Sequence, residues 1–374
     1  MAARTQAKPR TKKAPSRRPG ILPAQAIRGL IEAAHIKLAQ PRLANQLQPA
    51  SLDLRLGGQA YRVRASFLPG PGTVAAKLRD LQLHTIDLSR SAVLETGCVY
   101  IVPLLESMAL PPDLSAATNP KSSTGRLDVF TRVIADGVTA FDQVPAGYNG
   151  PLYAEICPQT FPIVVRQGSR LSQIRFRSGA SEDDDLALTE LHAREKLISS
   201  DHADIARGIA LSVDLTGGKD GLVGYRAKRH TGLVDVDAPG SCRIDDFWEP
   251  IRRLEGKRLI LDPDQFYILA SKEAVHVPPT HAAEMVPFNP LVGEFRVHYA
   301  GFFDPGFGHA AAGGTGSKAV LEVRSHKVPF VLEDGQIVGR LIYERMADVP
   351  EILYGRDLGS NYQAQGLKLS KHFK

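Results

Sequence analysis

The sequence has few cysteines and no long apolar run, and both shortages narrow the classes of protein it can belong to. Its three cysteines, Cys98, Cys157 and Cys242, are far apart and odd in number. This spacing argues against a disulfide framework or a thiolate metal site and is typical of a reducing compartment. The sequence has no apolar run of about 18 residues, so we expect no transmembrane helix. It also has no secretory signal with an apolar core. The sequence therefore predicts a cytoplasmic protein with no membrane partner.

The sequence also has little excess charge once its beginning is set aside. Residues 1–18 hold seven of the 46 Lys and Arg residues and no acidic residue, so the remainder carries 39 basic against 40 acidic residues. Residues 1–20 are rich in Pro and Ala, and we interpret them as a disordered basic tail. Such a tail can attract phosphate nonspecifically, but a nucleic-acid partner is not expected.

Helical periodicity is scarce after the start of the chain. Residues 23–39 place apolar side chains at helical spacing and predict one amphipathic helix. From Ser51 onward, short runs with a period near two alternate with Gly and Pro, which predicts an all-β sandwich or barrel with a few short helices. Seven predicted strands lie within residues 51–56, 60–65, 98–104, 126–134, 152–156, 161–166 and 171–177. Residues 181–207, with an acidic turn and a helical pattern, are interpreted as a linker between two domains.

An internal repeat indicates that the chain is a tandem duplication. Ser51-Leu52-Asp53-Leu54 resembles Ser212-Val213-Asp214-Leu215, and further blocks recur at one offset of 167 residues. The recurring blocks are 94–102 with 261–269, 110–112 with 277–279, 168–176 with 335–343, and Glu155 with Glu322. We therefore expect a first β domain at 21–180, a second at 208–346, and a C-terminal segment at 347–374.

The two copies differ in their polar residues. The first copy contains Asn-Pro-Lys-Ser-Ser-Thr-Gly-Arg at 119–126. Its hydroxyls and guanidinium suit a polyphosphate or a carboxylate. A solvated turn is the simpler interpretation of such a motif. At the offset of 167 residues, the second copy has no hydroxyl residues at the positions that match Ser122 and Ser123. If Asn289-Pro290 is instead aligned with Asn119-Pro120, Arg296 matches Arg126. The second copy has a turn at 303–307 containing Asp304, whereas the nearest acid to the first copy's turn is Asp142. This complementary loss predicts one composite site, made within one chain or between chains.

Taken together, these segments resemble the dCTP deaminase branch of the trimeric dUTPase-like β fold, particularly its longer bacterial members. The resemblance covers residues 21–374 in separate blocks. Its motifs are the strand SLDLRLGG, the SSxxR motif, the DPGF turn, a Glu-bearing strand, the strand GQIVGRLIYERM and the C-terminal Tyr-Gln-Ala-Gln-Gly. One departure is that the last Gly directly follows the second Gln, and another is the insertion at 308–318 between the DPGF turn and Glu322. The resemblance implies two dUTPase-like β-barrel or jelly-roll domains.

The resemblance also implies roles for individual residues. Lys121, Ser122, Ser123 and Arg126 would bind a triphosphate that carries Mg²⁺, mostly through water. A buried Glu would act alternately as base and acid in the attack of water on C4 of cytosine. We favour Glu322 over Glu155, because the DPGF turn lies in the copy that contains Glu322. The resemblance implies further substrate contacts. Tyr299 and Ala300 would contact the base, and either Phe307 or Tyr148 would lie near the sugar. Asp304 would also bind substrate, and Tyr362 and Gln365 would lie on a closing tail.

The leading hypothesis is hydrolytic deamination of dCTP to dUTP and ammonia, which supplies dTTP synthesis. Most cytosine deaminases hold zinc through His/Cys and Cys-x-x-Cys, and this signature is absent, so no zinc is expected. The alternatives are dUTP hydrolysis, both activities in one site, or a nonenzymatic nucleotide-binding module. A homotrimer, or a pseudo-symmetric assembly of the duplicated domains, is the expected oligomer.

Overall fold

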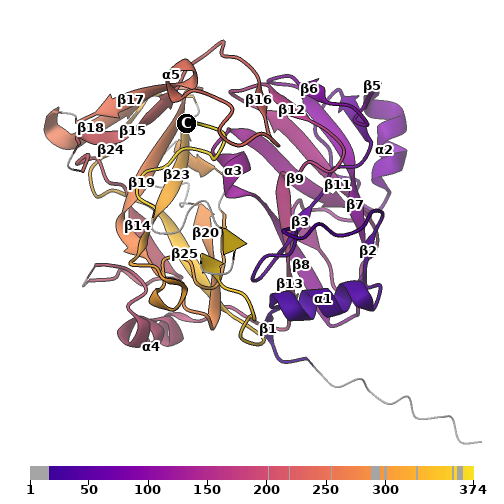
Figure 1. Cartoon of the computed structure of the whole chain (residues 1–374), viewed down its shortest axis with the longest axis horizontal. Helices are drawn as coiled ribbons and strands as arrows, with labels where there is room; N and C mark the ends of the chain where they lie inside the picture. The colour runs from indigo at the N-terminus through magenta and orange to yellow at the C-terminus, as the bar shows by residue number, and fades with distance from the viewer. Residues whose placement is uncertain are drawn as a thin grey trace, which may run out of the picture.

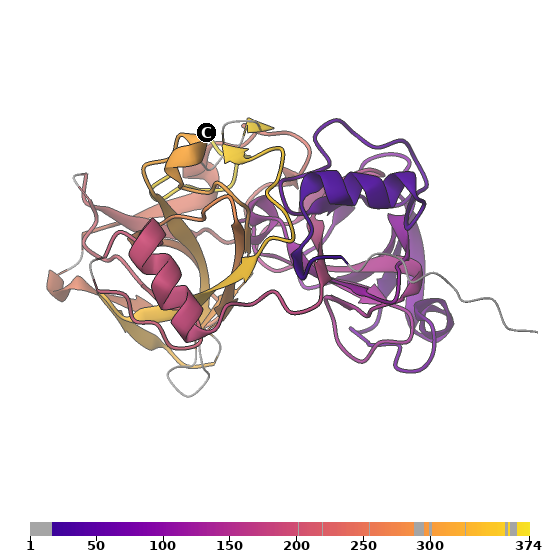
Figure 2. The ribbon, with the colours of Figure 1, turned by 90° about the horizontal axis from the view of Figure 1, so that it is seen from below.

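The computed structural model describes residues 17–374 except 201, 219, 254, 288–294, 299–300, 326, 356–357 and 360–364. The side chains of 287, 295–298 and 358–359 are also left undescribed. The chain is mainly β, as predicted, and forms two β-rich lobes side by side, with the first copy in indigo and magenta and the second in orange and yellow (Figures 1 and 2). None of the helices in the described part is long and apolar enough to cross a membrane.

The first copy packs two sheets against each other. One contains, in spatial order, β1 (Gly20–Ile21), β13 (Ser172–Ser178), β8 (Leu114–Pro120) and β10 (Gln143–Val144), with β3 (Leu52–Leu54) beside β13. The other contains β5 (Gln82–Asp87), β4 (Gln59–Val63), β7 (Val99–Ala109), β11 (Asn149–Pro158) and β9 (Val129–Ala135), with β2 (Ile36–Leu38) beside β7. Side chains of both sheets, such as Phe176 and Ile101, meet in one buried cluster.

The second copy repeats this arrangement. One sheet contains β14 (Ile209–Ser212), β25 (Ile337–Arg345), β20 (His281–Pro287) and β22 (Phe302–Phe303). The other contains β17 (Trp248–Arg252), β15 (Leu222–Ala227), β19 (Phe266–Val275), β23 (Ser317–Ser325) and β21 (Phe295–His298). The order β5-β4-β7-β11-β9 thus recurs as β17-β15-β19-β23-β21. The predicted tandem duplication is confirmed by this common topology, which is consistent with two dUTPase-like domains.

Short elements complete both copies. A three-stranded sheet contains β16 (Val234–Asp235), β12 (Ile163–Val165) and β6 (Ala92–Leu94), and two small pairs contain β18 (Arg258–Leu261) with β24 (Phe330–Glu333) and β26 (Tyr354–Gly355) with β27 (Leu358–Gly359). The helices are α1 (Ala24–Glu32), α2 (Val74–Leu81), α3 (Ser122–Gly125), α4 (Asp185–Glu195) and α5 (Ile244–Phe247), with short 3₁₀ turns at Glu255–Lys257 and Ala310–Ala312. Helix α4 lies between the two copies in the sequence.

The predicted first helix is too long. Helix α1 ends at Glu32, and Ala34 adopts a left-handed conformation with φ of 57°. The chain then turns into β2, where Ile36 is buried and pairs with Met108 of β7. Pairing with a neighbouring strand therefore overrides the helical spacing of the last apolar residues. The described part of the chain begins at residue 17, and β1 begins at Gly20, the last residue of the predicted tail at 1–20. Residues 1–16 of that tail lie outside the described part.

The two copies share a buried interface. Strand β16 of the second copy pairs in parallel with β12 of the first, with Val234 opposite Ile163. Phe161 and Trp248, one from each copy, meet edge to face at 5.3 Å between ring centroids. Phe373, next to the last residue, contacts Trp248 at 5.6 Å. The C-terminal residues therefore pack at the junction of the copies, where the site lies.

Candidate active site

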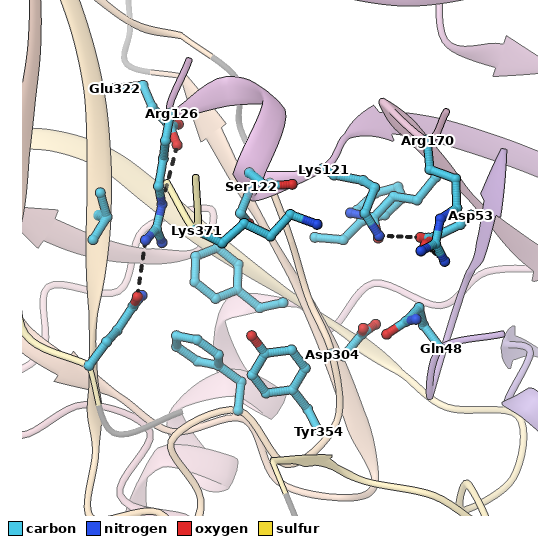
Figure 3. Close-up of a pocket in the computed structure, with 18 of the residues that line it drawn as sticks. Gln48, Asp53, Lys121, Ser122, Arg126, Arg170, Asp304, Glu322, Tyr354 and Lys371 are labelled. Carbon is cyan, nitrogen blue, oxygen red and sulfur yellow. Dashed lines mark hydrogen bonds and ion pairs between the residues drawn. The ribbon is translucent and has the colours of Figure 1, made fainter. Parts of the chain in front are cut away.

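A polar cavity of about 510 Å³ lies between the two copies. Its lining comes from three parts of the chain: the region around α3 in the first copy, strands and turns of the second copy, and the C-terminal segment. Figure 3 shows the side chains that face it. The lining includes Gln48, Asp53, Lys121, Ser122, Ser123, Arg126, Arg170, Asp237, Phe303, Asp304, Phe307, Glu322, Tyr354, Gln365 and Lys371.

One side of the cavity is rich in cations. Lys121, directly before α3, places Nζ 2.5 Å from Oδ1 of the buried Asp53, and Arg170 places Nη1 3.2 Å from Oδ2 (Figure 3). Lys371 comes from the C-terminal segment. Burial lowers its pKa, and the nearby charges of Lys121 and Arg170 lower it further. Three cations thus converge around Asp53, and such a cluster of lysine and arginine side chains suits a polyphosphate.

Helix α3 supplies the hydroxyl groups of this side. Ser122 and Ser123 are its first residues, after the extended backbone of Lys121. The helix ends at Gly125, and the N–H of the capping residue Arg126 donates to the Ser122 carbonyl at 3.1 Å. The Ser370 hydroxyl donates to the Ser123 carbonyl at 2.8 Å, so the C-terminal segment holds α3 in place. The predicted grouping of hydroxyls and guanidinium within a few residues is therefore present at the cavity wall.

At the other side of α3, Arg126 reaches the second copy. Its Nε lies 3.9 Å from Oε1 of Glu322 on β23. Its Nη1 donates to Oε1 of Gln365 at 3.1 Å and to the Lys368 carbonyl at 3.0 Å (Figure 3). Burial raises the pKa of Glu322 to about 8, and Arg126 only partly offsets this effect. A carboxyl group with a pKa near neutrality can both accept and donate a proton at physiological pH.

The remaining wall is aromatic and contains a second buried acid. Phe307 lies between Phe303 and Tyr354, with ring centroids 5.1 and 5.6 Å apart. Asp304 accepts from Nη2 of Arg175 at 3.5 Å, and burial raises its pKa. Gly306 has a φ of 97°, and a Cβ there would lie 3.0 Å from the Tyr354 carbonyl, so the turn requires glycine. This wall can pack against a planar ring or a sugar.

The structure brings most of the predicted site residues together and separates a few. Those lining the cavity are Lys121, Ser122, Ser123, Arg126, Asp304, Phe307, Glu322 and Gln365. The two alternatives in the first copy, Glu155 and Tyr148, do not line it. Tyr299, Ala300 and Tyr362 lie outside the described residues, as does the side chain of Arg296. Both halves of the predicted composite site come from one chain.

Glu155 occupies the position in the first copy that corresponds to Glu322, but its side chain does not face the cavity. Both lie on the corresponding strand of their copy, opposite Ile101 and Ile268 respectively. Glu155 is 1% exposed and accepts from Nη2 of Arg132 at 2.6 Å. The Arg132 guanidinium also stacks on Phe141 at 3.5 Å. The first copy therefore has a structural ion pair where the second copy has a carboxyl facing the cavity.

Asp142, the displaced acid of the first copy, is also used internally. It accepts from the Thr118 hydroxyl at 2.7 Å and the Val133 N–H at 2.8 Å. Burial raises its pKa to about 6. Tyr148 donates to the Pro151 carbonyl at 2.6 Å and accepts from the Asp136 N–H at 3.0 Å. Neither residue reaches the cavity.

Sequence reasoning missed several lining residues, of which Arg170, Lys371 and Tyr354 are the most important. Arg170 lies in a repeated block, and its counterpart at the offset of 167 is Ile337. A cation retained in only one copy was therefore a usable signal. Lys371 and Tyr354 have no such signal, because they follow the repeated blocks and reach the cavity only through the fold. Throughout the described ranges, no group of three or more His, Cys, Asp or Glu residues is placed to hold a metal ion.

Comparisons with known proteins relate both copies to one family. Residues 18–180 match the family described as the 2'-deoxycytidine 5'-triphosphate deaminase (DCD) N-terminal domain, and residues 182–373 match the corresponding C-terminal domain. The chain is 31% identical over 134 residues to a dCTP deaminase of Halorubrum lacusprofundi, covering 35% of this chain and 63% of that one. It is 28% identical over 157 residues to a "dCTP deaminase, dUMP-forming" of Aquifex aeolicus, covering 42% and 80% respectively.

A solved structure is similar over most of the chain. The crystal structure of 2'-deoxycytidine 5'-triphosphate deaminase from Agrobacterium tumefaciens superposes with a TM-score of 0.85 and is 64% identical in sequence. The match covers 88% of this chain and 100% of that one. The similarity therefore includes both copies and their arrangement.

Proposed function

The chain belongs to the 2'-deoxycytidine 5'-triphosphate deaminase family, and on this premise we propose that it converts dCTP and water to dUTP and ammonia in the cavity between its two copies. The observation that carries the proposal is the position of Glu322. This buried carboxyl of the second copy lies beside Arg126 of the first, in the same cavity as the cations that suit a triphosphate. One site thus combines a nucleotide phosphate pocket with a proton-transfer group.

The substrate is proposed to bind across the two copies. Lys121, Arg170, Lys371 and Ser122 face one region of the cavity and would bind the triphosphate. The Phe307 and Tyr354 side would pack against the deoxyribose and the base. Magnesium would be held by phosphate oxygens and water, because Asp53, the carboxylate beside Lys121 and Arg170, is already engaged by these two cations.

Glu322 is proposed as the proton-transfer residue. In its ionised form it takes a proton from water as the water oxygen attacks C4, and it delivers this proton to the ring nitrogen. Glu322 then takes the proton of the new C4 hydroxyl and delivers it to the amino group, the C4–N bond breaks, and ammonia leaves with a carbonyl at C4. The raised pKa of Glu322 suits this alternation, because neither protonation state is strongly disfavoured near neutral pH. Arg126 would orient the carboxyl group.

A second activity, hydrolysis of dUTP to dUMP and pyrophosphate, is favoured by one observation. Asp304 is a second buried carboxyl in the same cavity, and the nearby charge of Lys121 acts on its pKa. Asp304 lies on the aromatic wall but within reach of the Lys121 charge, so its carboxylate could orient water towards the phosphorus of a nucleotide bound at Lys121. The Aquifex relative, whose name describes it as dUMP-forming, shows that the family includes this product.

Product analysis tests the proposal. Purified protein is incubated with dCTP and Mg²⁺, and ammonia, dUTP, dUMP and pyrophosphate are measured over time. Ammonia with matching dUTP supports deamination alone, whereas ammonia with dUMP and pyrophosphate supports both activities. Binding of dCTP without ammonia would contradict the proposal and favour a nonenzymatic nucleotide-binding module.

The proposed assembly and compartment are inferred from the fold and from the cysteines. Since one chain supplies both halves of the cavity, self-association is not needed to complete it. We nevertheless propose a homotrimer or a pseudo-symmetric oligomer, because the dUTPase-like fold assembles in this way, and light scattering of the purified protein would measure it. The free Cys98, Cys157 and Cys242 suit the reducing cytoplasm.

A further inference from the structure

A buried pair of charges links the two copies next to Glu322 and has no role in the steps above. Asp128 follows α3 in the first copy, and Arg324 lies on β23 of the second, two residues after Glu322. Nη2 of Arg324 donates to Oδ2 of Asp128 and, at 2.9 Å, to the Thr160 hydroxyl. Thr160 donates to the same Asp128 oxygen at 2.5 Å. The Asp128 side chain is 1% exposed and that of Arg324 13%, so this ion pair is shielded from water.

The pair runs alongside the contact between Arg126 and Glu322. Residues two apart on a strand share a face, so Glu322 and Arg324 project from the same side of β23. Across the interface, Arg126 faces Glu322 and Asp128 faces Arg324. The four side chains therefore alternate in sign around one small area. Moving either member of one pair changes the field at the other.

The backbone at Asp128 holds this arrangement at some conformational cost. Its φ is 56°, in the left-handed region that residues other than Gly, Asn and Asp seldom adopt. The Asp128 N–H donates to the Gly125 carbonyl at 2.8 Å, and its carbonyl accepts from the Gln159 N–H at 2.9 Å. On the opposite side, Nη1 of Arg324 donates to the Asp264 carbonyl at 2.8 Å. Both charges are thus fixed from several directions.

We propose that Asp128 and Arg324 are positioning residues that hold the Glu322 carboxyl opposite Arg126 and set the electrostatic field around it. The inference rests on the proton-transfer role proposed for Glu322. Neither Asp128 nor Arg324 lines the cavity, so neither is placed to touch substrate. Their effect would be exerted through the two residues that do line it.

The other groups around Glu322 are its partners on the neighbouring strands and the charged residues of the cavity. On β19 its partner is the apolar Ile268, and on β21 its partner is His298, whose side chain lies outside the described part. Burial is the main cause of the raised pKa of Glu322, with Arg126 lowering it and Asp128 raising it. The remaining charged groups of the same cavity are Asp53, Lys121, Arg170, Asp237, Asp304 and Lys371.

The test uses two substitutions with opposite expected effects on the pH dependence of kcat/KM. Asp128→Asn tolerates the left-handed backbone and keeps an oxygen for Arg324 and Thr160, but it removes the negative charge. We expect the ionisation assigned to Glu322 to move to lower pH by about half a unit or more. Arg324→Met leaves Asp128 without its nearest cation and should move the same ionisation to higher pH.

The control is Glu249→Gln, which breaks an exposed ion pair between Glu249 of β17 and Arg226 of β15 and should leave the pH profile unchanged. Circular dichroism and thermal unfolding confirm that each variant is folded, and Arg324→Gln, which also removes the positive charge, replaces Arg324→Met if the latter is not. If Asp128→Asn and the Arg324 variant lower kcat/KM equally at all pH values without moving the ionisation, their role is merely structural and the inference is overturned. If Glu322→Gln remains active, the role proposed for Glu322 fails instead, so the two failures can be told apart.

Discussion

Arg126 and Glu322 belong to different copies of the duplicated domain, yet Nε of one lies 3.9 Å from Oε1 of the other, and both side chains are almost fully buried. This contact joins the hydroxyl-bearing helix of the first copy to the carboxyl of the second. Because each copy contributes a part that its twin has lost or uses differently, the cavity that the described residues form between the copies is a composite of both. The predictions below follow from this asymmetry.

Glu322→Gln should greatly slow deamination while keeping nucleotide binding. The amide has nearly the same shape but cannot accept a proton from water, and loss of such a group typically lowers the rate by about 10²–10⁴-fold. We expect kcat for ammonia release to fall by this amount, with the Kd for dCTP changed less than tenfold. Ammonia release and calorimetric titration measure the two quantities.

Glu155→Gln is the matched control, since Glu155 occupies the corresponding strand position. It should leave kcat near the wild-type value and lower the free energy of unfolding by about 1–3 kcal/mol, because Arg132 would lose its charged partner. Arg132 keeps its stacking on Phe141 and its bond to Ser66, which limits the loss. A large fall in kcat for Glu155→Gln, without unfolding, would contradict the assignment of Glu322.

Lys121→Met should weaken binding of the triphosphate. Removing one charge-assisted contact from the cationic side is expected to raise KM for dCTP about tenfold, with a smaller effect on dCMP, which has fewer phosphates. Lys272→Met serves as control, because Lys272 pairs with Asp334 at 2.6 Å away from the cavity. Steady-state kinetics with both substrates separate the cases. Equal rises in KM for the two substrates would argue against a phosphate-binding role for Lys121.

Much of the fold was predictable because its signals are local and repeated. The alternating runs identified the strands later seen as β3, β4, β7, β9, β11, β12 and β13. The offset between Glu155 and Glu322 showed that they are counterparts, and the loss of hydroxyls in the second copy directed attention to Ser122 and Arg126. Each of these inferences needed only neighbouring residues or the internal repeat.

The remaining features depend on long-range contacts that leave no local pattern. Ile36 joins a strand because β7 is available to pair with it, although its spacing fits the preceding helix equally well. Lys371 reaches the cavity because Phe373 is anchored against Trp248 at the interface. Glu155 is held in a buried ion pair by Arg132, which comes from the adjacent strand. Such contacts are decided by tertiary packing, which overrides local propensity.

The raised pKa of Glu322 should make the folded protein less stable as pH rises. Between its ordinary value of 4.5 and the folded value of about 8, the folded state retains a proton that the unfolded state has lost. The free energy of unfolding therefore falls with increasing pH across this range, and the contribution is constant below and above it. Glu322→Gln has no such ionisation. It should match the wild type near pH 4.5 and exceed it by roughly 1–4 kcal/mol at pH 8.5.

Urea unfolding at several pH values measures this difference. Asp142 and Asp304 also have raised pKa values and contribute slopes of the same sign. Comparison with Glu322→Gln at each pH isolates the contribution of Glu322, since the other groups are common to both proteins. A difference that stays constant with pH would show that Glu322 is not held in an environment that favours its protonated form.

The duplicated chain should bind one nucleotide, although it contains two copies of the domain. The position of Glu155 is filled by its ion pair with Arg132, and the segment matching Ser122 in the second copy lacks the hydroxyls. Calorimetric titration of Glu322→Gln with dCTP and Mg²⁺ avoids turnover and should give about one site per chain at saturation. Ser122→Ala combined with Lys121→Met should remove most of this binding, because both act on the same cavity. A second saturable site that survives these substitutions would mean that the first copy retains a nucleotide pocket of its own.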